Sequence, residues 1–298
     1  LFGFILVLVI YTFTLEGFGQ AMGFLFAPRF GELSDQAILE AMGQSFFSLS
    51  LGMAIMITYG SYLSPKESIT KSAALIVSMD TLVAIMACVI LYPIIFSFPE
   101  IKSSISGSTT GMLFITLPPL FYTKLSGGAL LGPLFYLLVM FAALSSSISL
   151  LEVVVALLID RFSYKRIKAT LVSSGVLFIG TVLAAFSLNP DSFLAHFQVF
   201  GSSESGFLYD MNHLFFRGKT GIFNIADHLV ANWLLPVTGL CITLFVGWFL
   251  DKKIILEELG LSSGSLYFQV FRVIMRFIAP LAIFYVLYSV IAGTADFT

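Results

Sequence analysis

The chain has 298 residues, of which 58% are hydrophobic and only 11% are charged, and its formal net charge is -2. A soluble domain carries roughly 25% charged residues, so this composition indicates a polytopic membrane protein that resides in the lipid bilayer. The small negative charge provides no basic stripe for phosphates, which excludes a nucleic-acid partner.

The first apolar segment, residues 1–14, opens with LFGFILVLVIYTF. It is too short to cross a bilayer, because a crossing needs about 20 apolar residues. We interpret it as the second half of a helix, so that the chain is expected to be the C-terminal part of a longer protein.

Six longer apolar segments follow, and each is long enough to cross the bilayer. Helices are expected, because lipid offers the backbone no water with which to form hydrogen bonds. The predicted spans are 37–62, 70–97, 127–160, 168–188, 227–250 and 267–292.

The charges of the connections predict the orientation of these spans. Lysine and arginine gather near 63–69, 160–168 and 251–259, which the positive-inside rule places in the cytoplasm. The intervening segments are therefore expected outside, at 15–36, 98–126 and 189–226. The last two are long enough to carry short helices or to act as lids.

The span 37–62 contains the stretch GQSFFSLSLGMAIMITYG, with Ser48, Ser50 and Gly52 near its middle. Glycine weakens a helix by roughly 1 kcal/mol relative to alanine, and serine hydroxyls can bend the helix axis. An interrupted helix would free backbone groups for a substrate or an ion, as in many transporters. The alternative is that the small residues allow close helix packing.

Two other spans also carry polar groups. Asp80 would cost at least ~2.5 kcal/mol near the bilayer centre, so it is expected to face a cation, a polar cavity or a donor on another helix. Ala142, Ser145 and Ser146 share one helix face and could offer three oxygens to a hard cation, although small-residue packing would explain them too. Glu152 also needs a partner.

No enzymatic site is visible in the sequence, and we expect none. Cys88 and Cys241 lie in different spans and are interpreted as small buried hydrophobic residues. There is no phosphate-binding loop, nucleophile elbow or HExxH motif. No metal-ligand spacing links the three histidines, which are His196, His213 and His228.

Five stretches together resemble the neurotransmitter:sodium symporters, whose bacterial branch carries amino acids. GQSFFSLSLGMAIMITYGSYLSP resembles their broken sixth helix, AALIVSMDTLVA the seventh and FAALSSSISLLE the eighth. GMLFITLPPLFYTKLSGG resembles the external lid loop, and ADHLVANWLLPVTGLCITLFVGW the tenth helix of eleven-helix members. The resemblance implies an all-α integral membrane protein with an incomplete LeuT-like inverted-repeat transporter fold: the second five-helix repeat plus flanking helices.

The resemblance assigns each segment a place in that fold. In chain order these are 1–14 as the second half of TM5, 15–36 as an extracellular loop, 37–62 as the broken TM6, 70–97 as TM7, 98–126 as the extracellular lid loop, 127–160 as TM8, 168–188 as TM9, 189–226 as an extracellular segment, 227–250 as TM10 and 267–292 as TM11.

The resemblance also implies roles for individual residues. The substrate-lining positions are Phe47, Ser48, Ser50, Met53 and Leu150. The first sodium site would use Ser48 and Asp80, and the second would use Ala142, Ser145 and Ser146. Asp227 matches the acidic half of the outer gate and Asp160 that of the inner gate, although Asp160 alone would be interpreted as a solvated charge at a helix end.

The implied function is sodium-coupled symport of an amino acid by alternating access in a bacterial inner membrane. Phe47 and Met53 suggest an apolar or aromatic substrate. Two sodium sites are expected, and chloride is not, because Asp80 stands where many members have Asn and supplies a fixed negative charge.

Without the missing N-terminal helices the chain is expected to be inactive alone. The alternatives are a sodium-independent facilitator or channel of the same fold, or a non-transporting membrane subunit.

Overall fold

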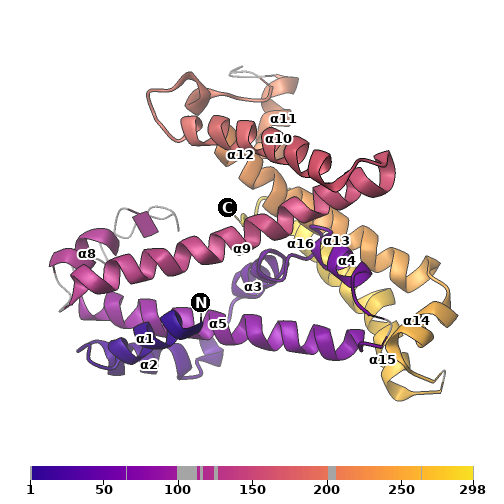
Figure 1. Cartoon of the computed structure of the whole chain (residues 1–298), viewed down its shortest axis with the longest axis horizontal. Helices are drawn as coiled ribbons and strands as arrows, with labels where there is room; N and C mark the ends of the chain where they lie inside the picture. Colours follow the sequence, from indigo (N-terminus) through magenta and orange to yellow (C-terminus); the bar gives the residue numbers. More distant parts are fainter. Residues whose placement is uncertain are drawn as a thin grey trace. The chain divides into compact units, whose positions relative to one another are not determined.

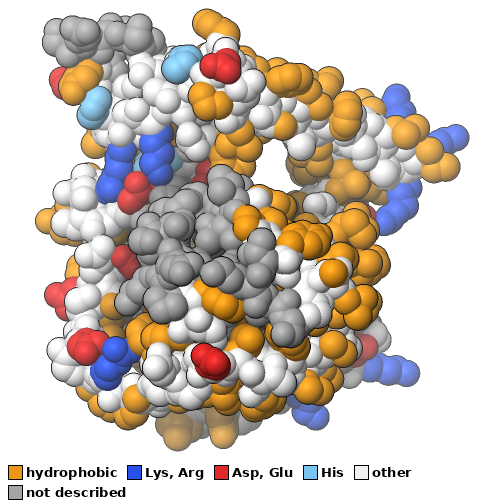
Figure 2. Space-filling view, turned by 90° about the vertical axis from the view of Figure 1, so that its left-hand side faces the viewer, with side chains coloured by type: hydrophobic (Ala, Val, Ile, Leu, Met, Phe, Trp, Pro, Cys, Tyr) orange, Lys and Arg blue, Asp and Glu red, His pale blue; other side chains and the backbone are white. Residues whose placement is uncertain are grey.

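The computed structural model describes residues 2–64, 66–98, 113–114, 117–123, 127–200, 206–262 and 264–297. These residues form helices, and no strand occurs among them. Hydrophobic side chains spread over the face seen in Figure 2, with charged ones scattered among them. Five helical runs are long and apolar enough to cross a membrane: Ile69–Ser97, Gly128–Phe162, Arg166–Ser187, Ile222–Phe249 and Leu266–Ile291.

The chain divides into two compact units, and the boundary between them falls inside two of the long helices. Unit 1 comprises Leu1–Glu32 and Leu75–Ile148, and unit 2 comprises Leu33–Ala74 and Ser149–Thr298.

Unit 1 is built on one hydrophobic cluster. Its elements are α1 (Phe2–Thr12), α2 (Phe18–Phe26), η1 (Phe30–Glu32), α8 (Leu117–Thr123), most of α5 (Ile69–Ser97) and the first part of α9 (Gly128–Phe162). The cluster joins residues of α1, α5, α8 and α9, among them Leu8, Ile94, Phe121 and Phe135. Side chains from four helices thereby form a continuous apolar core in this unit.

Unit 2 contains six separate helices, together with the last part of α9 and two longer helical runs, among the residues that the structure describes. The six helices are α3 (Asp35–Ser48), α4 (Ile55–Ser61), α10 (Arg166–Ser187), η3 (Phe193–His196), α11 (Phe207–Phe216) and α14 (Lys252–Leu259).

Two long helical runs of unit 2 change their winding along their length. The first consists of α12 (Ile222–His228), the π-helical η4 (Leu229–Leu234), α13 (Leu235–Leu244) and the π-helical η5 (Phe245–Phe249). The second consists of α15 (Leu266–Val273), the π-helical η6 (Ile274–Ile278) and α16 (Ala279–Ile291). α13 and α16 lie side by side, as Figure 1 shows.

The helices begin and end close to several predicted spans, since α5 matches 70–97 and α10 matches 168–188. The run that was expected at 227–250 begins earlier, at Ile222. The proposed lid loop, 98–126, lies largely outside the described residues. The numbering of these helices as TM5 to TM11 stays a prediction.

One sequence interpretation is wrong in part. Cys88 is partly buried, but Cys241 is exposed, not buried as expected. Cys241 belongs to α13, an apolar helix that also exposes Val237 and Leu244. A small apolar residue on an exposed face of such a helix is compatible with lipid contact. Both cysteines are free, in agreement with the expectation that they form no disulfide.

Candidate functional site: the break between α3 and α4

The segment 37–62 is interrupted where the sequence predicts it. α3 ends at Ser48 and α4 begins at Ile55, and Figure 1 draws them as separate helices. In the stretch between them Ser50, Gly52 and Ala54 adopt left-handed backbone angles, with φ of 54°, 80° and 61°. This conformation costs roughly 1–2 kcal/mol for a residue other than glycine, so the packing of the surroundings must hold it in place.

The break leaves peptide oxygens without hydrogen bonds. The N–H of Leu51 donates to the Phe46 carbonyl at 2.8 Å, and the N–H of Ser50 donates to the Phe47 carbonyl at 3.1 Å. Within the described residues, no hydrogen bond reaches the carbonyls of Leu49, Leu51 and Met53. Backbone groups at membrane depth need a partner, so these oxygens are candidates to bind a cation or a polar substrate.

α13 packs directly against this break. The Thr238 hydroxyl lies 2.9 Å from the Gly52 carbonyl, and its one hydrogen is shared among that oxygen and the Leu234 and Leu235 carbonyls of the preceding turn. A Cβ atom on Gly52 would lie 2.6 Å from Thr238 Oγ1 and 2.7 Å from the Leu235 carbonyl oxygen. Gly52 is therefore required both by its backbone angle and by the closeness of α13.

Four of the predicted substrate-lining residues lie at the end of α3 or within the break. Phe47 and Ser48 end α3, whereas Ser50 and Met53 lie in the unwound stretch. The Phe47 side chain is 54% exposed, and Met53 packs against the apolar cluster that contains Phe46. The structure thus places four of the five candidates in one short segment. The fifth, Leu150, is an exposed residue of α9 in the same unit.

The three residues of the second predicted sodium site lie within five positions of one helix. Ala142, Ser145 and Ser146 lie on α9 and are exposed. The Ser145 hydroxyl donates to the Ala142 carbonyl at 2.8 Å, so these two oxygens are adjacent. In the first predicted site, Ser48 belongs to unit 2 and Asp80 to unit 1. The pairing of Ser48 with Asp80 remains a prediction.

The partner that Glu152 was expected to need is present. Arg166 donates to both carboxylate oxygens of Glu152, at 2.9 and 2.8 Å, and the Tyr62 hydroxyl donates to one of them at 2.7 Å. A neighbouring hydrogen bond joins the Tyr59 hydroxyl to Ser149 at 2.6 Å. These contacts tie α4 to α9 and to the start of α10. One guanidinium nitrogen of Arg166 bridges the two carboxylate oxygens, so both contacts are charge-assisted hydrogen bonds.

The two predicted gate residues differ in their surroundings. Asp160 is an exposed residue near the end of α9, and within the described chain no ion pair reaches it. Asp227 is half-buried in α12, next to a buried histidine. Their roles as gates stay predictions.

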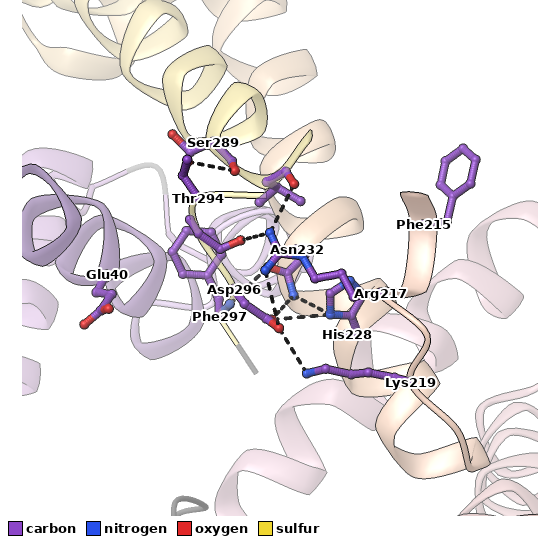
Figure 3. Close-up of polar contacts among 12 residues, drawn as sticks. Glu40, Phe215, Arg217, Lys219, His228, Asn232, Ser289, Thr294, Asp296 and Phe297 are labelled. Atoms are coloured by element: carbon purple, nitrogen blue, oxygen red, sulfur yellow. Dashed lines mark hydrogen bonds and ion pairs between the residues drawn. The ribbon is translucent and has the colours of Figure 1, made fainter. Parts of the chain in front are cut away.

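A polar cluster around Asp296 escaped the sequence analysis. Its carboxylate lies 3.4 Å from Lys219 Nζ, 3.8 Å from Arg217 and 3.4 Å from His228 Nδ1, and it accepts a hydrogen bond from Asn232 at 3.1 Å (Figure 3). Asn232 and His228 are almost completely buried. The cluster joins the C-terminal segment to α12, to η4 and to the turn that follows α11.

Comparison with known proteins places this arrangement in a family. Residues 2–208 match the sequence profile described as the sodium:neurotransmitter symporter family. An uncharacterized sodium-dependent transporter of Bacillus subtilis, YhdH, is 36% identical over 293 residues, which are 98% of this chain and 59% of the relative. The sodium-dependent nutrient amino acid transporter 1 of Drosophila melanogaster is 27% identical over 175 residues, covering 56% of this chain and 27% of the relative.

The fold is also similar to that of a solved structure, MhsT in complex with L-phenylalanine. The TM-score is 0.73 at 30% sequence identity, and the match covers 96% of this chain and 59% of MhsT. Together with the five apolar helical runs, this likeness defines a multi-pass membrane protein with the LeuT-like transporter fold.

The chain belongs to the sodium:neurotransmitter symporter family. The family and the all-helical fold expected from the sequence are thereby confirmed. The chain spans 59% of the length of YhdH and of MhsT.

Proposed function

We propose that the intact protein couples the inward movement of sodium to the uptake of an amino acid with an apolar or aromatic side chain. MhsT, which was solved with L-phenylalanine, supports an aromatic side chain, and the fly transporter of nutrient amino acids supports an amino acid as the substrate. The expected location is a bacterial inner membrane, and the expected activity is that of the intact protein, not of this chain alone.

The observation that carries the proposal is the break at 49–54. Its carbonyl oxygens without hydrogen bonds lie between two helices of a membrane protein, where they can replace part of the hydration shell of a sodium ion. Hydroxyls at Ser48 and Ser50 would add oxygen ligands for the ion and for the polar end of the amino acid. Phe47 would cover the bound substrate, while Met53 and Leu150 would face its side chain.

Two sodium ions are proposed as co-transported substrates. The first would bind at Ser48 and Asp80, and the second at Ala142, Ser145 and Ser146. Binding of sodium and substrate would favour an occluded arrangement, from which the protein opens inward. Asp227 and Asp160 would close the outer and inner gates by pairing with basic residues elsewhere in the intact protein.

Replacing both hydroxyls of the second site tests the sodium assignment. In the intact protein, Ser145→Ala combined with Ser146→Ala should raise the sodium concentration for half-maximal uptake at least tenfold, since tenfold corresponds to about 1.4 kcal/mol of lost binding. The matched control is Ser147→Ala, because the Ser147 hydroxyl bonds the Ala143 carbonyl, outside the proposed triad. Equal sodium dependence in the two variants would remove the second site from the proposal.

Chloride dependence tests the role of Asp80. The fixed carboxylate should make uptake by the wild-type protein independent of chloride. Asp80→Asn should make uptake depend on added chloride, because the variant lacks a negative charge next to sodium. Uptake of radiolabelled L-phenylalanine with chloride or gluconate as the anion measures both effects. Chloride-stimulated uptake by the wild type would contradict the assignment.

A further inference from the structure

A basic pocket opens where the two long helical runs of unit 2 meet the connection between them. It has a volume of about 200 Å³, and Trp248, Lys252, Phe268, Arg272 and Arg276 are among the residues that line it. An adjoining cavity of about 320 Å³ shares the three cationic residues and extends along α15 and η6. The positive-inside rule assigns this connection to the cytoplasmic side.

Close packing of η5 against η6 shapes the pocket. A Cβ atom on Gly247 would lie 2.6 Å from the Met275 carbonyl oxygen, so glycine allows the two helices to touch. Nε of Arg276 donates to the Gly247 carbonyl at 2.6 Å, and the guanidinium lies 5.2 Å from the centre of the Trp248 ring. These contacts hold Arg276 against the pocket wall and leave the two terminal nitrogens of its guanidinium group for a ligand.

The cations of the pocket lack acidic partners. Within the described residues, no ion pair is found for Lys252, Arg272 or Arg276. Nζ of Lys252 lies 5.4 Å from the centre of the Phe268 ring. This cation–π contact attracts the ammonium group but does not neutralise its charge. Two acidic side chains of this connection are engaged elsewhere: Asp251 caps α14 by accepting a hydrogen bond from the N–H of Lys253, and Glu257 pairs with the Lys253 side chain at 3.9 Å.

The two arginines belong to a helical run long enough to span the bilayer. Arg272 and Arg276 are four residues apart, so they share one face of Leu266–Ile291. A run of this length is about 39 Å long, so in a hydrocarbon core of about 30 Å the arginines would lie about 5 and 10 Å below its edge. Placing a charged arginine at such depth costs free energy unless the side chain pairs with an anion or reaches the membrane surface.

We propose that this pocket binds the headgroup of an anionic phospholipid from the cytoplasmic leaflet. Arg272 and Arg276 would donate to the phosphodiester oxygens, for which the planar guanidinium geometry is suited. Lys252 would face the outer part of the headgroup, and Trp248 and Phe268 would pack against the glycerol region. Phospholipid is the occupant that supplies both a phosphate and apolar chains at this level of the membrane, as the mixed lining requires.

Lipid-dependent stability of the intact protein tests this inference. Thermal unfolding in mild detergent is measured with phosphatidylglycerol, with phosphatidylcholine or with inorganic phosphate added. Phosphatidylglycerol should raise the melting temperature of the wild type, and the other two should not. Arg272→Gln combined with Arg276→Gln should weaken the apparent affinity for phosphatidylglycerol at least fivefold.

Two single variants keep the test decisive if the double variant does not fold. Lys252→Gln changes an exposed residue of the pocket and should weaken the phosphatidylglycerol effect. Lys253→Gln removes an adjacent charge that does not line the pocket and should leave the effect unchanged. The inference is overturned if phosphatidylcholine or inorganic phosphate stabilises equally, if phosphatidylglycerol has no effect on the wild type, or if both lysine variants respond alike.

Discussion

The break at 49–54 and the Asp296 cluster are two polar regions of the same compact unit, and both lie against the helical run Ile222–Phe249. At the break, three carbonyl oxygens accept no hydrogen bond from the residues that the structure describes, and one shared hydroxyl contacts the Gly52 carbonyl. In the cluster, four side chains meet one carboxylate. Buried polar groups that satisfy one another stabilise a fold, whereas groups left open are available to a ligand. We therefore propose that the break binds the ligands and that the Asp296 cluster stabilises the folded protein.

The largest expected effect is at Gly52. Gly52→Ala places a methyl group against the Leu235 carbonyl and forces alanine into a left-handed conformation, so the break should change shape. The conformation alone costs roughly 1–2 kcal/mol, which predicts a loss of sodium-dependent substrate affinity of about five- to thirtyfold. Binding of radiolabelled L-phenylalanine to the intact protein measures this loss.

Gly60→Ala is the matched control for that variant. Gly60 lies in α4, and no atom would lie within 4 Å of an added Cβ. Alanine should raise the stability by up to about 1 kcal/mol and leave substrate affinity unchanged. If the two variants bind substrate equally well, the shape of the break does not determine binding.

A smaller effect on substrate binding is expected for Asp296→Ala, which should act on stability. The variant leaves Arg217 and Lys219 without their carboxylate, while about three quarters of each side chain stays buried. Removing one partner of a fully buried ion pair costs about 3–5 kcal/mol of folding stability. Because these side chains are partly exposed, we expect a loss of about 2 kcal/mol. Thermal unfolding should shift by several degrees, with the sodium dependence of uptake within twofold of the wild type.

Asp191→Ala controls for the loss of a negative charge, because Asp191 is exposed and has no ion pair within the described chain. It should unfold like the wild type. A change in sodium affinity in Asp296→Ala without a change in stability would reverse the assignment of the two regions.

The smallest effect is expected for Thr238→Val. It removes the hydroxyl shared by the Gly52 and Leu234 carbonyls and keeps the side-chain shape. One hydrogen bond contributes about 0.5–1.5 kcal/mol, which predicts two- to tenfold weaker substrate binding. Thr243→Val is the control, because its hydroxyl bonds only the Leu240 carbonyl, away from the break. Equal binding by both variants would show that the contact with Gly52 is not needed.

The helices and the break could be predicted from the sequence because their causes are local. Apolar length defines α5 and α10, and Gly52 with its neighbouring serines indicates an interruption. The left-handed turn at Ala54 could not be predicted, since alanine has no preference for that conformation. It depends on tertiary packing, as does the exact end of α3 at Ser48.

The Asp296 cluster and the basic pocket were missed because they join distant residues. Asp296 lies 79 positions from Arg217, and no local pattern links the two. A weak signal was nevertheless present: His228 and Asn232 are four residues apart on one helix face, as are Arg272 and Arg276 within an apolar run. Polar pairs at this spacing inside a membrane-length helix predict a partner, although they do not identify it.

The most direct test of the central claim is the structure of the intact protein, determined with sodium and L-phenylalanine bound. We expect the amino acid and a sodium ion to contact the peptide oxygens and hydroxyls of residues 47–54, with Gly52 still in its left-handed conformation. A continuous helix through 49–54, or a substrate bound at a place that does not touch this segment, would contradict the account.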